Sequence, residues 1–81
     1  MVNESMRKNT AEYTSSLDAI IELVKRLKTY EIRHGIDSED FFDRYSKGSM
    51  NDDIEHVEWA NDYRHYLALR REVEDQLRHA A

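Results

Sequence analysis

Apolar side chains recur at helical spacing over residues 11–34 of the chain. They stand mostly three positions apart, at Leu17, Ile20, Ile21, Val24, Leu27 and Tyr30, with Leu23 widening the stripe. This spacing places the side chains on one face of an α-helix. We therefore predict a first long helix from Ala11 to His34, ended by Gly35 in a left-handed conformation. Residues 1–10 lack this period and are expected to form a flexible tail.

A short helix and a second long helix are predicted next. Asp37 is a natural N-cap, and Glu39 and Asp40 bring negative charge to the first turn of a helix of about ten residues that ends at Gly48. Another cap is expected at residues 51–53, and neither Gly nor Pro interrupts the chain from there to about Arg78. The apolar period of this last helix is carried by Ile54, Val57, Trp59, Ala60, Tyr63, Tyr66, Leu67, Val73 and Leu77.

These elements predict an all-α fold with a single helical domain over residues 11–81. In this fold two long helices form a hairpin and the short helix joins them. The 81 residues include only 2 Gly and 0 Pro, which argues against turn-rich β-sandwiches and barrels. Two long helices make a thin layer, and the last helix carries apolar groups on more than one side. We therefore expect the hairpin to dimerise into a bundle or to dock on a partner. Alternatively, Tyr63 and Leu69 are isolated exposed apolar residues.

Composition and charge exclude several classes of protein. The absence of Cys excludes disulfides and thiolate metal sites. The longest apolar run is Ala19-Ile20-Ile21, too short to cross a membrane, and the N-terminus lacks the apolar segment of a signal peptide. We expect a cytoplasmic protein without a membrane role. The net charge of −5 and the acids at Asp52 and Asp53 argue against direct nucleic-acid binding.

One acidic pattern suggests chemistry. Glu55-x-x-Glu58 and Glu72-x-x-Asp75 together resemble the signature with which MazG-type nucleotide pyrophosphatases hold Mg²⁺ against a triphosphate. In that family the two halves lie on facing helices, whereas here both fall on one predicted helix. Glu55 and Glu72 would lie about 25 Å apart, so one chain cannot hold an ion between them. A MazG-like enzyme stays a lesser alternative, and we expect neither enzymatic activity nor a cofactor.

The histidines give no stronger indication of a metal site, and the serines give none of nucleophilic catalysis. The pairs Asp53-x-x-His56 and Asp62-x-x-His65 share helix faces, as ligands do in di-iron bundles, but those sites need further carboxylates in the core. Each His is expected to be a surface residue or a local ion partner. No serine stands in a nucleophile elbow.

The aromatic residues Phe41, Phe42, Tyr45, Trp59, Tyr63 and Tyr66 gather in the middle of the chain. If the short helix folds back on the last one, these side chains form a cluster at the turn of the hairpin. The cluster is then core, or part of it is exposed and anchors a partner, since Trp and Tyr are favoured at interfaces.

Residues 30–69, about half of the 81 residues, resemble a family of short helical proteins. The resemblance rests on the run Tyr30 to Tyr45 (YEIRHGIDSEDFFDRY), then Gly48, Asp52, Asp53, Glu58-Trp59-Ala60 and Tyr63. These proteins of archaea and cyanobacteria are often encoded beside a small toxin-like gene and are treated as antitoxins. His34 and Ile36 stand where Tyr and Met are commoner in them.

The resemblance implies a role in binding a partner protein, and we expect the chain to neutralise a small basic partner by occluding its active surface. Our candidate residues are the acids Asp52, Asp53, Glu55, Glu58 and Asp62 and the aromatic anchors Trp59, Tyr63 and Tyr66. Acids of this kind would speed encounter with a basic protein, and buried aromatic rings would slow its release. The alternative is a self-assembling structural protein without a dedicated partner.

Overall fold

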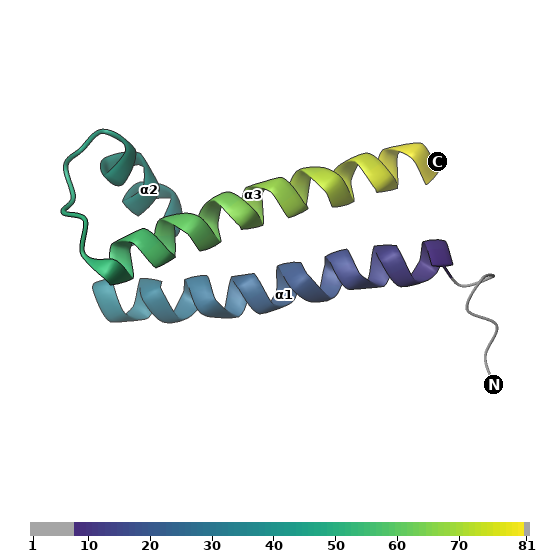
Figure 1. The fold of residues 1–81 in the computed structure, drawn as a ribbon, viewed down its shortest axis with the longest axis horizontal. Coiled ribbons are helices and arrows are strands. Elements are labelled where there is room, and N and C mark those ends of the chain that lie inside the picture. Colours follow the sequence, from purple (N-terminus) through teal and green to yellow (C-terminus); the bar gives the residue numbers. More distant parts are fainter. Residues whose placement is uncertain (1–7, 81) are drawn as a thin grey trace.

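The computed structural model describes residues 8–80, and all the regular structure in that range is helical (Figure 1). Helix α1 spans Lys8–His34, α2 spans Ser38–Ser46 and α3 spans Ile54–Ala80. The predicted all-α class is confirmed. Helix α1 begins three residues before the predicted start, and residues 1–7 of the predicted tail lie outside the described range.

The helix ends follow local signals, with one exception. Gly35 has φ +67 and Gly48 has φ +79, the left-handed conformation expected after a helix. Asp37 occupies the N-cap position of α2, but its carboxylate makes no capping hydrogen bond. Instead the backbone N–H of Ser38 donates to Oε2 of Glu31 at 2.9 Å, so a side chain of α1 caps α2.

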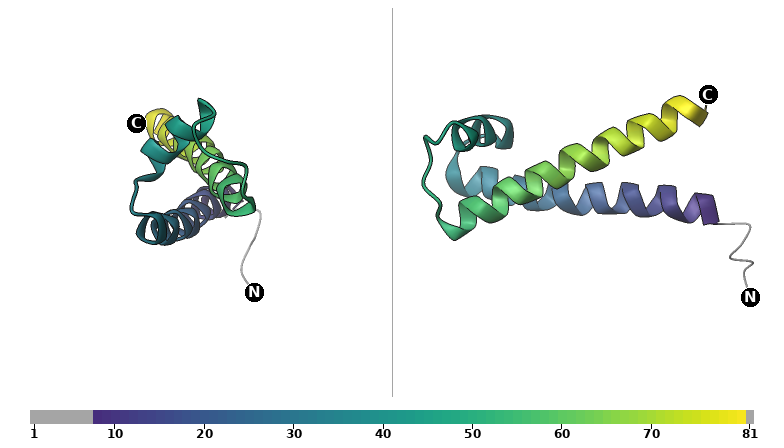
Figure 2. Two further views of the ribbon diagram at one scale, coloured as in Figure 1. Left: turned by 90° about the vertical axis from the view of Figure 1, so that its left-hand side faces the viewer. Right: turned by 45° about the horizontal axis from the view of Figure 1, so that its top comes forward.

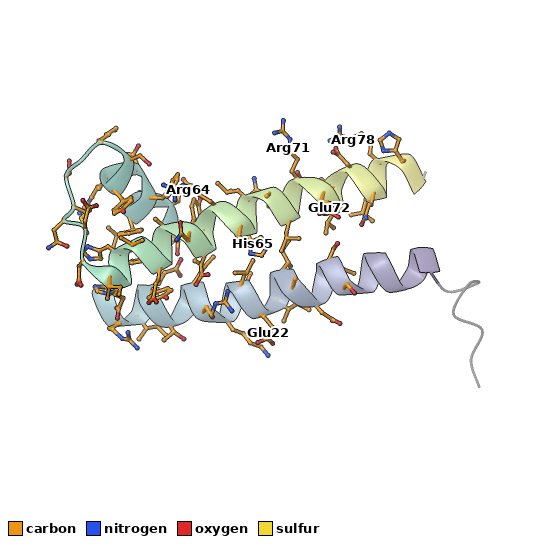
Figure 3. The ribbon with its side chains drawn as sticks, in the orientation of Figure 1. Glu22, Arg64, His65, Arg71, Glu72 and Arg78 are labelled. Atoms are coloured by element: carbon orange, nitrogen blue, oxygen red, sulfur yellow. The ribbon has the colours of Figure 1, made fainter. Side chains whose placement is uncertain are left out.

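Helices α1 and α3 lie side by side and antiparallel, and α2 packs against both of them at one end (Figures 1 and 2). Three cross-helix contacts share one register: Ser16–Glu72, Arg26–Asp62 and Arg33–Glu55. On both helices the first two contacts are ten residues apart and the next two are seven residues apart. The two helices therefore keep a constant register along their length. Glu72 points from α3 toward α1, whereas Arg71 points away from it (Figure 3).

The core lies at the α2 end of the molecule. Its buried members are Leu27 of α1, Phe41 of α2 and Trp59 and Ala60 of α3. Around them pack the partly buried side chains of Tyr30, Ile36, Phe42, Tyr45, Met50, Tyr63 and Tyr66. The aromatic cluster predicted from the sequence therefore forms where the short helix meets the long ones.

The buried face of α1 is rotated relative to the predicted stripe. Leu23 and Leu27 are only 2 % and 5 % exposed, whereas Ile21 and Val24 are 50 % and 46 % exposed. The seven predicted apolar positions span roughly 180° of the helix, more than one neighbour can cover. The register with α3 turns the Leu23 edge inward and leaves the Ile21 edge in solvent.

Candidate functional site

Trp59 is a core residue, although the sequence made it a candidate surface anchor. It is 0 % exposed, its ring stacks on Phe41 with centroids 3.8 Å apart, and Tyr30 stacks at 5.4 Å. Its indole Nε1–H donates to the Ser38 hydroxyl at 2.9 Å. Trp59 thus joins all three helices and offers no surface to a partner in this conformation.

Tyr63 and Tyr66 are half-buried and line a groove between the helices. The groove has a volume of about 450 Å³, with Val24 and Lys28 on its α1 side and Glu39 at its α2 end. Burial, the largest cause, raises the pKa of Tyr63 above its ordinary value, so the phenol stays a neutral hydrogen-bonding group. Both side chains keep part of their surface in solvent, and they remain candidate anchors.

Glu55 is committed to contacts within the chain. Its carboxylate binds the guanidinium of Arg33 at 2.6 Å and also the ring Nε2 of His34. The hydrogen bond from His34, and then the charge of Arg33, lower the pKa of Glu55 below its ordinary value. This acid ties the first turn of α3 to the last turn of α1, and it is half-buried rather than open to a partner.

Asp62 is similarly engaged. Both of its carboxylate oxygens accept hydrogen bonds from Arg26 of α1, at 2.9 and 3.1 Å. This bidentate pair raises the pKa of Arg26, chiefly through the hydrogen bond to Asp62. Two of the five candidate acids therefore hold α1 and α3 together.

The other three candidate acids, Asp52, Asp53 and Glu58, are exposed, and no salt bridge among residues 8–80 involves them. They belong to a strongly acidic end of the molecule. Residues 35–58, which form α2, its connections and the start of α3, contain eight Asp and Glu but two Lys and Arg. The net charge of this segment is −6, larger in magnitude than the −5 of the whole chain.

The structure separates the candidate acids from the candidate tyrosines. Glu58 and Asp62 line a hollow of about 370 Å³ with Arg26, and this hollow shares no lining residue with the tyrosine groove. Arg26 and Lys28 are two positions apart on α1, which places them about 200° apart around that helix. Glu58 and Asp62 therefore belong to a different hollow from the two tyrosines, although Asp62 and Tyr66 are one turn apart on α3.

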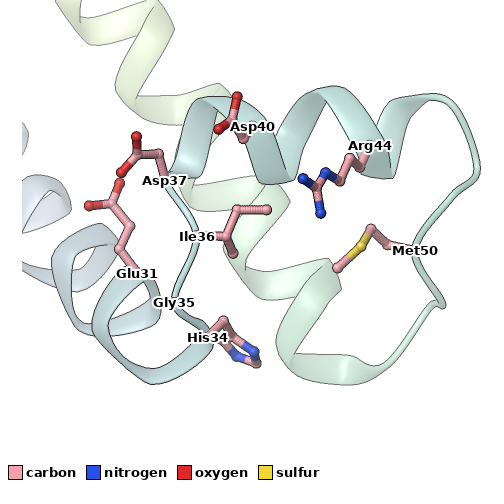
Figure 4. Close-up of a pocket in the computed structure, with 8 residues that line it drawn as sticks. All are labelled: Glu31, His34, Gly35, Ile36, Asp37, Asp40, Arg44 and Met50. Carbon is pink, nitrogen blue, oxygen red and sulfur yellow. The ribbon is translucent and has the colours of Figure 1, made fainter.

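A third hollow lies at the acidic end itself, beside the turn that joins α1 to α2 (Figure 4). It has a volume of about 560 Å³, and Glu31, Asp37, Asp40 and Arg44 supply its charged side chains. The sequence indicated only capping roles for Asp37 and Asp40. The excess of acids over bases in residues 35–58 is the sequence feature that indicates their place in the acidic end.

The MazG-like pattern does not assemble within one chain. Helix α3 is continuous from Ile54 to Ala80, so Glu55 and Glu72 lie about 25 Å apart along one axis. No group of three or more His, Asp or Glu residues within the described range could hold a metal ion.

His56 differs from its prediction. It is buried at 8 % exposure rather than on the surface, with its ring Nδ1 3.0 Å from the carbonyl oxygen of Asn51. His34 contacts the carboxylate of Glu55, an acid 21 positions away at the start of α3.

Comparisons with protein-family models, with curated proteins and with solved structures find no match for this chain. Within residues 8–80, neither long helix has an uncharged apolar stretch of the length that a membrane requires. The functional assignment therefore depends on the surfaces described above.

Proposed function

We propose that this chain is a non-catalytic, antitoxin-like protein-binding module that neutralises a small basic partner protein by occluding its active surface. The observation that carries the proposal is the acidic end: eight acids and two bases within residues 35–58. Such a concentration of one sign of charge favours a partner surface of the opposite sign.

The charges at this end divide between scaffold and surface. Arg33 and Arg26 neutralise Glu55 and Asp62, and these pairs fix the start of α3 against α1. Asp52, Asp53 and Glu58 remain exposed for cationic groups of a partner. Glu58 stands on α3 next to the buried Trp59, and Asp52 and Asp53 immediately precede the first turn of α3. The core therefore restrains these acids before binding and reduces the entropy cost of association.

The aromatic anchors of this proposal are Tyr63 and Tyr66, whose rings are half-buried. They line a different hollow from Glu58, and a partner that wraps around the α2 end would reach both hollows. In this proposal α1 and α3 pair within one chain as a hairpin, and the module acts as a cytoplasmic homodimer.

A second candidate function is self-assembly without a dedicated partner. The half-exposed side chains of Ile21 and Val24 favour it, because aliphatic groups on one helix edge lose water contact when two copies associate.

The proposal is tested by isolating the tagged protein from extracts of its own cells and identifying bound proteins together with the mass of the complex. We expect a small basic protein in fixed ratio, released as salt is raised because exposed charges are screened. Purified partner is then titrated against the triple variant Asp52→Asn, Asp53→Asn, Glu58→Gln. The matched control neutralises three exposed acids outside the acidic end, Asp18→Asn, Glu22→Gln and Glu74→Gln.

Both variants lose three negative charges, so a general charge effect weakens binding equally in the two. The proposal requires the first variant to bind at least about tenfold more weakly than the control, mainly through slower association. Equal affinities, or the recovery of homo-oligomer alone, would reject the acidic end as the binding surface.

A further inference from the structure

Helix α2 lies at one end of the α1/α3 pair (Figure 2), where its residues Ser38 and Glu39 help to line the groove described above. It has 9 residues, whereas α1 and α3 have 27 residues each. At 1.5 Å per residue, α2 spans about 13 Å beside helices about 40 Å long. The remaining two-thirds of this side, the open face, has no covering element among residues 8–80.

The open face carries exposed aliphatic side chains. Ile21 and Val24 of α1 are 50 % and 46 % exposed. Leu77 of α3 is 55 % exposed and stands two turns beyond Arg70, which lines the groove, so it lies on the same side. Val73 lies between Arg70 and Leu77 and is 9 % exposed.

Polar contacts bridge the two helices on the opposite side of the α1/α3 pair. The Arg26–Asp62 and Arg33–Glu55 pairs bridge the two helices there. These ion pairs keep favourable contacts with water and need no further packing partner. Exposed aliphatic groups, in contrast, are stabilised when another surface covers them and removes them from water. The two sides of the molecule therefore differ: one carries ion pairs, and the open face carries exposed aliphatic side chains.

We propose that a second copy of this chain covers the open face, with the two copies antiparallel around a two-fold axis. The proposal deepens the homodimer part of the proposed function by naming its interface. It requires no basic partner, so the two proposals succeed or fail separately.

The shape of the chain fits this arrangement. Helix α2 projects from the side that also carries the open face, and a second copy seated on that face must stop where α2 begins. In the antiparallel arrangement each open face meets the other, and the two α2 helices flank the shared core at opposite ends. The result is a four-helix arrangement, in which α1 and α3 of one copy pack on α1 and α3 of the other.

The distribution of charge selects the antiparallel direction. Residues 8–34 contain five Lys and Arg and four Asp and Glu, and residues 59–80 contain four of each, so these segments are nearly neutral. The segment 35–58 carries −6. In an antiparallel pair the nearly neutral segments of the two copies face each other, and the two acidic segments lie at opposite ends. A parallel pair would bring the two acidic segments, each of charge −6, side by side, and they would repel each other.

The size of the face predicts a weak dimer. It is about 27 Å long and about 20 Å wide, from two helices each about 10 Å across. Each copy therefore covers about 500 Å², and the pair buries about 1,000 Å², near the lower limit for a specific interface. Such a dimer forms reversibly as the protein concentration rises.

The test is sedimentation of the full chain over a range of concentrations, for the wild type, Ile21→Lys and Ile32→Lys. Ile32 is a matched control because it is on the same helix and 77 % exposed, but lies at the α2 end beyond the open face. Lys is a good helix former, and circular dichroism at low concentration verifies that both variants fold. We expect Ile21→Lys to weaken dimerisation at least about tenfold, because the charge enters the interface twice, and Ile32→Lys to change it less than twofold.

The direction of the pair is measured with a spin label. The chain contains no Cys, so Ser46→Cys at the end of α2 gives a single labelling site. The antiparallel dimer places the two α2 helices at opposite ends of the shared core, so it predicts labels at least about 27 Å apart, the length of the open face. A monomer at every concentration, equal effects of the two Lys variants, or labels close together would overturn the proposal.

Discussion

Ser38 accepts a 2.9 Å hydrogen bond from the indole N–H of Trp59, and both residues are buried. They are 21 positions apart, one at the start of α2 and the other in α3. This bond satisfies the only polar atom of a side chain that is otherwise surrounded by aromatic rings, and it fixes the position of α2 on the long helices.

Ser38→Ala is therefore expected to destabilise the fold. The indole donor would be left buried without a partner, which costs about 1–3 kcal/mol. The free energy of unfolding, measured by urea titration, should fall by this amount. Ser46→Ala is the matched control, because Ser46 is exposed at the other end of α2 and should change stability little. Equal losses in the two variants would contradict the role of the bond.

Gly35→Ala tests the turn between α1 and α2. A Cβ at this position would meet nothing within 4 Å, so crowding is not an issue, but φ is +67. An L-residue other than Gly adopts this conformation at a cost of about 1–2 kcal/mol. Thermal unfolding should show a lower melting temperature for Gly35→Ala and a smaller decrease for Gly35→Asn, since Asn tolerates the left-handed region. The reverse order would contradict the explanation.

The Glu55 contacts predict a loss of stability in acid. The pKa of Glu55 is lowered from its ordinary value of 4.5, so the folded chain binds this proton less tightly than the unfolded chain. Its stabilising contribution is present above pH 4.5 and is lost as the pH falls through the lowered pKa. We expect Glu55→Gln to flatten the acid limb of a plot of unfolding free energy against pH.

The control for this measurement is Glu58→Gln, which removes a neighbouring exposed acid of α3. Its acid limb should stay close to that of the wild type. If both variants flattened the limb to the same degree, general charge repulsion at the acidic end would account for the effect instead.

The Arg26–Asp62 pair is expected to contribute modestly to stability. The geometry is bidentate, but the Arg26 side chain is 56 % exposed, so water and salt screen the attraction. A double-mutant cycle with Arg26→Ala and Asp62→Ala should give a coupling energy of about 0.5–1 kcal/mol that decreases with salt. The exposed pair between Asp43 of α2 and the C-cap residue Lys47 is a comparison pair and should couple less. A larger coupling for that pair would contradict this ranking.

The extent of the helices could be predicted from the sequence because the signals are local. Gly35, Gly48 and the acids of the first turn of α2 act within a few residues of themselves. Long runs without Gly or Pro then leave helix as the favoured state. The tertiary contacts could not be predicted in the same way. The apolar positions of α1 cover roughly half of its circumference, and only the register with α3 decides that Leu23 is buried and Ile21 is not.

The candidate site was likewise predictable in its local composition and not in its tertiary contacts. The sequence indicated that acids and aromatic residues gather in the middle of the chain, and both sets do lie at or near the α2 end. It could not indicate that Asp62 pairs with Arg26, because the two are 36 positions apart. The burial of Trp59 depends on Ser38 and on rings from two other helices. A single Trp in an aromatic stretch is compatible with a core or a surface position until those partners are known.

The placement of Trp59 also makes the chain an optical reporter of its own assembly. It is the only Trp among the 81 residues, and it touches rings from both other helices. Departure of α2 alone would uncover one face of the indole, whereas separation of α1 and α3 would uncover the other. Emission wavelength and quenching by added iodide can therefore distinguish partial opening from complete unfolding, without any label attached to the protein.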